Sequence, residues 1–367
     1  MRSLFGFGTK TDDASAASKH SEKAAEDNTA AAAATATEKQ PAQPAILPIL
    51  SCPAPSDSSA LQEIKPLNDD EQKVLDKIKA DIPELIKDLP PIDPEAEKYI
   101  DPEVPLDIEG WLTDECLARY VRARKGVYED TKKALRKTIE WRASVRPHAL
   151  RPDVVELENR TGKMYFNGFD RFSRPVIYMY NHRQNTKDPD NQIRWVIYTL
   201  ELCIRHMCPG VEKVTLAIDA TQWGFSSSVS IGTAKKFLDI LGNHYPERLG
   251  RAVIFMPPKF FVAFYSLVSP FIDPVTKAKV AFVNPNSPPT AQAVQQQQQQ
   301  AEGSGSPWIA VEDCFDRDLL EKDCYGSWAF QYDHKTYWGA IESEFAELKA
   351  EMISRQNAAS SQEETKQ

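Results

Sequence analysis

Two polar segments flank an apolar run in the second half of the chain, and these residues have the types and spacing best suited to chemistry. The first segment is Pro246-Glu247-Arg248, and the second runs from Asp273 to Lys279 and includes Thr276. The run between them is rich in large apolar side chains, including Phe255, Phe260, Phe261, Phe264, Tyr265, Leu267 and Val268. Charged and hydroxyl groups beside an apolar wall indicate that the ligand is an amphiphile.

The apolar run from Ala252 to Ile272 approaches the length of a membrane span, about 20 residues, but its composition argues against one. Pro257-Pro258, Lys259 and Pro270 would break such a helix or place a charge inside it. A buried strand at Arg251–Met256 followed by a short helix fits better. That helix is apolar nearly all round, which is typical of a buried core helix, and the alternative is a mobile lid that contacts lipid.

The usual signatures of enzymes are missing from the sequence, which contains no nucleophile elbow, zinc-protease helix, phosphate loop or dinucleotide fingerprint. Asp219 stands where α/β enzymes place catalytic groups, although an aspartate at a strand end more often caps the next turn. Cys203 and His206 could share a helix face but lack a second pair of metal ligands. We therefore expect no catalytic residues, no metal site and no cofactor other than a bound phospholipid.

Short apolar segments alternate with longer helical ones after Pro152, a pattern typical of an α/β fold with a mostly parallel sheet. The spacing of apolar residues predicts helices at Asn191–Met207, Val229–Gly242 and Lys335–Met352. The five predicted strands are Lys163–Phe166, Val176–Tyr180, Lys213–Ile218, Arg251–Met256 and Val280–Val283.

The residues before this domain predict a helical region. Apolar spacing indicates a helix at Asp69–Ile82, and Thr113 is the expected cap of a helix that ends near Lys125, before another helix at Glu129–Val145. We expect a tail without a fold over residues 1–65, followed by an acidic, proline-rich linker with one helix over 66–110. A helical lobe over 111–150 then precedes the α/β domain over 151–340, which contains a low-complexity insertion at 284–307. A C-terminal helix and tail occupy residues 341–367.

Charge is distributed unevenly along the chain, whose formal net charge is −9. Leu117–Arg146 carries ten basic and three acidic residues, which suits either an anionic membrane surface or a solvated helix face. Six dispersed cysteines predict reduced thiols. The start of the chain lacks the apolar segment of a secretory signal. We therefore expect a cytoplasmic protein that binds internal membranes, such as the endoplasmic reticulum or lipid droplets, only transiently.

Five motifs follow one another along the chain at intervals that are typical of one family. They are Val121-Arg122-Ala123-Arg124-Lys125, Glu140-Trp141-Arg142, Arg174-Pro175-Val176, Tyr245-Pro246-Glu247-Arg248-Leu249-Gly250 and Pro270-Phe271-Ile272-Asp273-Pro274-Val275-Thr276. Together they resemble the CRAL-TRIO lipid-transfer family over about residues 111–283. Tyr325-Gly326 and the segment Tyr332–Trp338 look like the fungal phosphatidylinositol-transfer branch that is linked to drug resistance.

The resemblance implies an α-helical amino-terminal lobe packed on a βαβ lobe, with a deep apolar pocket closed by a movable gate helix at residues 258–269. It implies phosphatidylinositol as the ligand, with its headgroup held by Lys125, Glu247, Thr276 and Lys279, and with Arg124 beside them. Lysines pair with phosphate, and carboxylate and hydroxyl groups bind inositol hydroxyls. Alternatively, Thr276 and Asp273 only cap a helix, and Lys125 or Lys279 is solvated. The gate and acyl-chain pocket would be formed by Phe260, Phe261, Phe264, Tyr265, Leu267, Val214 and Leu216.

Val214 and Leu216 mark a departure from the family, because relatives that exchange phosphatidylcholine have hydroxyl side chains at these positions of the third strand. The phosphate of phosphatidylcholine would lack donors there, so a sterol is our hypothesis for the second ligand. Two functions are consistent with this predicted phosphatidylinositol site. One is a carrier that moves phosphatidylinositol between membranes, and the other is a sensor that presents it to a partner such as a lipid kinase. A lipid-modifying enzyme is the weakest alternative, and no nucleic-acid partner is expected.

Overall fold

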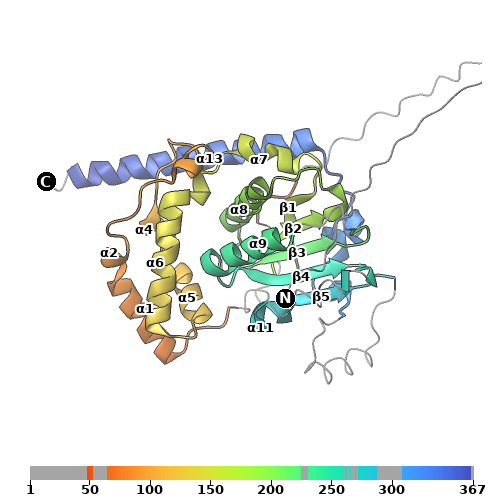
Figure 1. Ribbon diagram of the computed structural model, residues 1–367, viewed down its shortest axis with the longest axis horizontal. Helices are drawn as coiled ribbons and strands as arrows, with labels where there is room; N and C mark the ends of the chain where they lie inside the picture. Colours follow the sequence, from red (N-terminus) through yellow and green to blue (C-terminus); the bar gives the residue numbers. More distant parts are fainter. Residues whose placement is uncertain are drawn as a thin grey trace, which may run out of the picture. The chain divides into compact units, whose positions relative to one another are not determined.

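A five-stranded sheet in the order β1-β2-β3-β4-β5 lies at the centre of the computed structural model (Figure 1). The structure describes residues 48–52, 64–224, 230–259, 272–286 and 308–364, together with residues 261, 262, 265 and 269. β1 and β2 pair antiparallel, and β2 to β5 run parallel to one another. The strands are β1 (Met164–Phe169), β2 (Pro175–Tyr180), β3 (Val214–Asp219), β4 (Leu249–Phe255) and β5 (Val280–Val283). Each overlaps a predicted strand, so the α/β fold with a mostly parallel sheet is confirmed.

The two faces of the sheet are buried against different sets of side chains. Alternate residues of a strand point to opposite faces. In β4, Ala252 and Ile254 belong to a small apolar cluster, whereas Val253 and Phe255 belong to the main core. The helices that connect the parallel strands, α8 (Pro189–Arg205) and α9 (Ile231–His244), both contribute apolar residues to the main core. The other face carries the small cluster, which includes Phe261 and Tyr265 of the predicted gate segment.

Residues 69–145 form a helical lobe with a core of its own. α1 (Asp69–Ala80) begins after Asn68, whose side chain accepts hydrogen bonds from the backbone of the first turn. α5 (Asp114–Ala123) begins after the predicted cap, Thr113, whose hydroxyl accepts from the Cys116 N–H at 3.2 Å. The third predicted helix, Glu129–Val145, is α6 (Tyr128–Val145), so the three helices predicted here are present. The sequence predicts one helix over residues 66–110, whereas the short helices α2 (Ile82–Leu85) and α3 (Pro94–Glu97) and the start of α4 (Ile108–Trp111) also lie there.

The chain after the sheet packs against β1 and β2. Glu321 is buried there and accepts hydrogen bonds from Tyr165, Asn167 and Tyr180. Burial raises the pKa of Glu321 to about 7 despite these donors.

None of the described helices is both long and apolar enough to cross a membrane. The remaining elements are α7 (Pro152–Asn159), α11 (Pro274–Ala278), α13 (His334–Glu364), and the 3₁₀ helices η2 (Pro147–Ala149), η3 (Asn181–Arg183), η6 (Val311–Asp313), η7 (Arg317–Leu319) and η8 (Lys322–Cys324).

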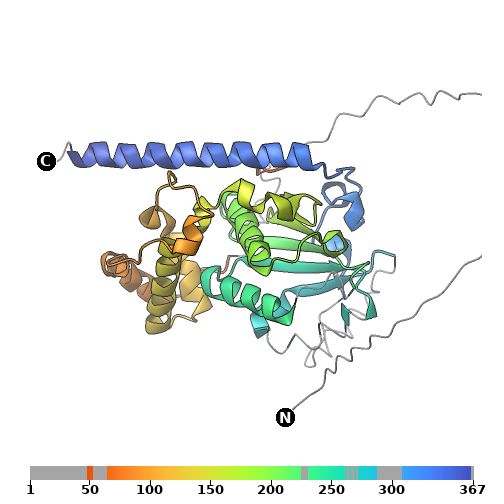
Figure 2. The ribbon, with the colours of Figure 1, turned by 45° about the horizontal axis from the view of Figure 1, so that its top comes forward.

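The closing helix is longer than predicted. The sequence predicts Lys335–Met352, whereas α13 continues to Glu364 and runs beside α7 (Figure 2). Its last turns are mostly exposed and carry few apolar residues, so no amphipathic pattern marks them in the sequence.

Residues 48–52 correct two expectations. They fall within the tail that we expect to lack a fold, yet Leu50 is buried and the Ile49 carbonyl accepts a hydrogen bond from the Gly168 N–H of β1 at 2.8 Å. The prediction of reduced thiols is wrong for Cys52 and Cys208, which form a disulfide across 156 residues of sequence. Cysteine spacing alone does not reveal which distant segments pack together, so the sequence could not identify this pair.

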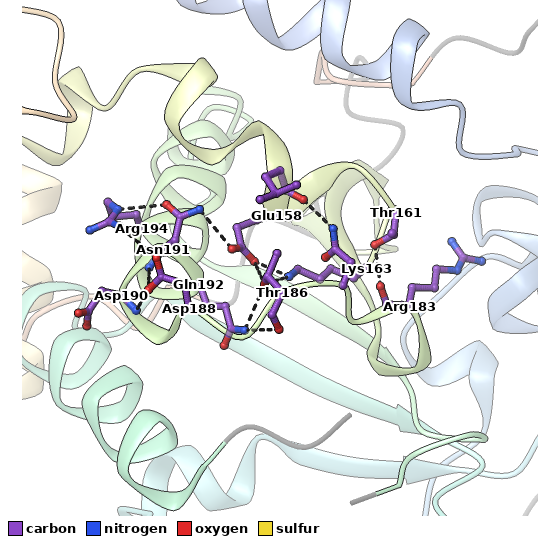
Figure 3. Close-up of polar contacts among 12 residues, drawn as sticks. Glu158, Thr161, Lys163, Arg183, Thr186, Asp188, Asp190, Asn191, Gln192 and Arg194 are labelled. Atoms are coloured by element: carbon purple, nitrogen blue, oxygen red, sulfur yellow. Dashed lines mark hydrogen bonds and ion pairs between the residues drawn. The ribbon is translucent and has the colours of Figure 1, made fainter. Parts of the chain in front are cut away.

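A buried polar network fastens the connection between β2 and α8 (Figure 3). Glu158 of α7 is fully buried and forms an ion pair with Lys163, which precedes β1. Thr186, in the connection itself, donates to Glu158 at 2.6 Å and accepts from Lys163 at 2.9 Å. Asn191, in the first turn of α8, donates to the same carboxylate at 3.2 Å. This network lies at the carboxyl end of β2, the opposite edge of the sheet from the charged residues described next.

Candidate functional site

Charged residues stand just before two neighbouring strands, at the amino-terminal edge of the parallel sheet. Glu247 lies two residues before β4, and Lys279 directly precedes β5. The strands are held side by side, since the Ala252 N–H donates to the Lys279 carbonyl at 2.9 Å. Lys279 Nζ therefore lies 3.3 Å from Glu247 Oε2, and the two side chains are 17% and 27% exposed. Partial burial strengthens such charged contacts, while the remaining exposure leaves them open to a ligand.

The backbone of Glu247 has an unusual conformation. Its φ is 58°, in the left-handed region that residues with a Cβ rarely adopt. The turn is tied to β3, because the Val214 N–H donates to the Arg248 carbonyl at 2.8 Å. Such a conformation costs about 1 kcal/mol or more and is typical of sites where a side chain must be aimed at a ligand.

Thr276 lies in the first turn of α11, one turn before Lys279. Its N–H donates to Asp273 Oδ1 at 2.9 Å, so Asp273 caps the helix, as in the alternative interpretation from the sequence. Partial burial would raise the pKa of Asp273, but hydrogen bonds from the Thr276 side chain and from the backbone hold it below its usual range. Asp273 can cap the helix while Thr276 binds a ligand. Thr276 and Lys279 are three residues apart, so their side chains lie on the same face of the helical turn.

Lys125 and Arg124 lie at the end of α5, on the helical lobe. Lys125 is exposed, and its φ of 53° ends the helix where the sequence predicts. One turn earlier, Arg122 forms an ion pair with Glu212, which lies two residues before β3. The end of α5 is thus attached to the same edge of the sheet. Within the described part of the chain, however, neither Lys125 nor Arg124 forms a hydrogen bond or ion pair with Glu247 or Lys279.

The apolar part of the candidate site is the small cluster on the second face of the sheet. Phe261 and Tyr265 are buried there, with ring centroids 6.4 Å and 5.6 Å from that of Phe282. Leu216 packs against this cluster and against the main core, whereas Val214 belongs to the main core. Burial of the two aromatic rings fits a core helix and a closed lid equally well. The other three predicted gate residues, Phe260, Phe264 and Leu267, lie outside the described residues.

The basic segment 117–146 is only partly a surface. Arg142 is 4% exposed, and its two Nη atoms donate to Glu201 of α8 at 2.8 Å and 3.1 Å. Burial would raise the pKa of Glu201, but Arg142 lowers it to about 2. Arg119 likewise lies 3.3 Å from Glu212. Both sequence interpretations, a membrane surface and a solvated face, are wrong for these two arginines, which form buried ion pairs with residues 59 and 93 positions away.

Two family descriptions match this chain. The CRAL/TRIO domain matches residues 159–303, and the CRAL/TRIO, N-terminal domain matches residues 72–137. Together they cover more than half of the chain, which therefore belongs to the CRAL/TRIO family of lipid-binding and lipid-transfer proteins. The resemblance seen in the sequence motifs is thus confirmed.

Relatives of known sequence cover different shares of the chain. A CRAL-TRIO domain-containing protein of Schizosaccharomyces pombe is 36% identical over 228 residues, which are 62% of this chain and 20% of that protein. The phosphatidylinositol transfer protein PDR17 of Saccharomyces cerevisiae is 30% identical over 257 residues, 67% of this chain and 66% of that protein. This chain thus spans a fifth to about two thirds of these two relatives. The crystal structure of Sfh5 matches with a TM-score of 0.47 and 16% identity, covering 77% of this chain and 100% of that chain.

Proposed function

We propose that this protein binds phosphatidylinositol and transfers it between membranes. The observation that carries the proposal is the contact between Glu247 and Lys279, two predicted headgroup ligands that meet at the edge of a sheet with an apolar face. The similarity to PDR17, which is named as a phosphatidylinositol transfer protein, supports the same ligand.

The headgroup of phosphatidylinositol offers a phosphodiester and inositol hydroxyls, and the site has groups for both. Lys279 pairs with the phosphate, Glu247 accepts hydrogen bonds from hydroxyls, and the Thr276 hydroxyl can donate or accept. The acyl chains lie against the small apolar cluster that contains Phe261 and Tyr265.

Transfer takes place at a membrane, because the acyl chains cannot leave into water at a useful rate. Each buried methylene contributes about 0.8 kcal/mol, and a phospholipid has two long chains. The pocket therefore opens against a bilayer, and residues 258–269 are the proposed gate. A sterol as the second lipid, and presentation of phosphatidylinositol to a lipid kinase, stay predictions.

Mass spectrometry of the lipids that co-purify with the protein tests the headgroup assignment. We expect the wild type to carry phosphatidylinositol and Glu247→Ala and Lys279→Ala to retain about tenfold less, because each loses a charge-assisted hydrogen bond of about 1.5–3 kcal/mol. Lys98→Ala is the matched control, since Lys98 pairs with Glu95 at an exposed helical turn. Absence of phosphatidylinositol from the wild type, or equal retention in all three variants, would contradict the proposal.

A further inference from the structure

Each parallel strand of the sheet begins just after a charged residue, and two of these residues, Arg174 and Lys213, lie outside the predicted headgroup set. Arg174 precedes β2, Lys213 precedes β3, Glu247 lies two residues before β4, and Lys279 precedes β5. The pairing of neighbouring strands places the four in one row along the amino-terminal edge. Glu247 stands in this row between the two lysines.

Lys213 differs from the other cations of the row because none of the residues that the structure describes is its hydrogen-bond acceptor. Arg174 is 5% exposed and lies 3.6 Å from Asp170 Oδ2, and Lys279 lies 3.3 Å from Glu247 Oε2. The Lys213 side chain is partly buried, and it has no hydrogen bond or ion pair with any residue that the structure describes.

The charges around Lys213 are mostly positive. Burial lowers the pKa of Lys213, and so do the nearby charges of Lys279, Arg174 and Arg122, while Glu247 opposes them. Because Glu247 pairs with Lys279, no carboxylate among the described residues forms an ion pair with Lys213. An unpaired, partly buried ammonium is costly, and a protein keeps one where a ligand supplies the counter-charge.

We propose that Lys213 binds the phosphodiester of an anionic glycerophospholipid and thereby selects for negatively charged headgroups. The inference rests on the proposed function and adds a specificity-determining residue to the same site. Glu212, next to Lys213 in the sequence, pairs with Arg119 and Arg122 and so does not neutralise it. A phosphate held between Lys213 and Lys279 leaves the carboxylate between them to accept hydrogen bonds from headgroup hydroxyls.

The same row acts against phosphatidylcholine. The quaternary ammonium of that lipid would approach a row that already carries uncompensated positive charge. Discrimination between the two lipids therefore combines attraction of the anionic headgroup with repulsion of the zwitterionic one.

Lipid loading of the full chain from mixed vesicles of phosphatidylinositol and phosphatidylcholine tests this role. We expect Lys213→Met to load about tenfold less phosphatidylinositol, because a charge-assisted hydrogen bond is lost, and to load as much phosphatidylcholine as the wild type or more. Lys213→Arg keeps the charge and should retain phosphatidylinositol. Lys187→Met is the matched control, because Lys187 is exposed at the opposite edge of the sheet.

Thermal unfolding without lipid separates a ligand-binding role from a structural one. Lys213→Met removes an ammonium that has no hydrogen bond or ion pair among the described residues, so the Tm of the lipid-free protein should not fall. The variant should instead lose the increase in Tm that phosphatidylinositol vesicles give the wild type. A lower Tm of the lipid-free variant would assign Lys213 a structural role and overturn the inference.

The remaining outcomes separate this inference from the proposed function. Normal phosphatidylinositol loading by Lys213→Met, with loss in Glu247→Ala, would overturn the inference and leave the proposed function in place. Absence of loading by the wild type would overturn both. Inositol 1-phosphate without lipid is the soluble probe, and binding of this probe as tightly as the lipid would reassign Lys213 to a free phosphate ester.

Discussion

Single charged residues in this protein serve two distinct roles. Arg142 and Glu201 are both nearly inaccessible to solvent and join the helical lobe to α8, whereas Glu247, Lys279 and Lys213 keep part of their surface open to solvent. Breaking a buried pair leaves an uncompensated charge, while an open pair can exchange its partner for a ligand. Burial rather than residue type therefore separates structural charges from candidate binding charges.

Replacing Arg142 by methionine should lower the free energy of unfolding by about 3–5 kcal/mol, because Glu201 would be left buried without its counter-charge. Urea unfolding measures this loss as a lower midpoint. Lys73→Met is the matched control, since Lys73 and Asp70 are 75% and 91% exposed and such a pair contributes less than about 1 kcal/mol. Equal midpoints for the two variants would show that the buried pair has no structural role.

Among the elements, α6 and α9 are joined by a contact whose strength depends on pH. His244, the last residue of α9, stacks on Trp141 of α6 with ring centroids 4.2 Å apart. Its Nδ1 lies 3.1 Å from the Thr138 hydroxyl. Burial, together with the charges of Lys137 and Arg142, lowers the pKa of His244 to about 4. The folded protein therefore keeps this imidazole neutral under conditions in which the unfolded chain would protonate it.

Acidification should weaken this contact between the two helices. The histidine pKa of the unfolded chain is about 6.5, so the unfolded state binds more protons between pH 6.5 and about 4. The stabilisation is complete above pH 6.5 and is lost as the pH falls through this window, by about 2 kcal/mol at pH 5. Urea unfolding at pH 7 and pH 5 should show a smaller loss for His244→Gln than for the wild type. Equal losses would show that His244 is protonated in the folded state.

For the molecule as a whole, residues 48–52 attach to β1 through the Ile49 carbonyl and to Cys208 through a disulfide. Deletion of residues 1–65 removes Leu50 and Cys52, whereas deletion of residues 1–47 keeps both. We expect the longer deletion to lose about 2–5 kcal/mol of unfolding free energy, because the disulfide to Cys208 closes a long loop.

Thiol labelling of the unfolded, unreduced chain should detect only four cysteines, Cys116, Cys203, Cys314 and Cys324. Labelling of all six would contradict the disulfide.

Local patterns were sufficient to predict most of the elements. Val280–Val283 is a continuous apolar run and has the bounds in the structure that the sequence predicts. Thr113 and Gly126 mark the two ends of α5, because one offers a side-chain cap and the other adopts a φ of 71°. These features depend on neighbouring residues alone, so the sequence by itself determined the positions of the strands, the longer helices and the family motifs.

Only the tertiary structure decided which of these residues meet. Glu247 reaches Lys279 because β4 lies beside β5, and Arg142 reaches Glu201 because the helical lobe packs on α8. The isolation of Lys213 is likewise visible only once its neighbours are paired elsewhere. A periodic pattern in the sequence shows which side of an element is buried, but the partner across the interface depends on how distant segments pack.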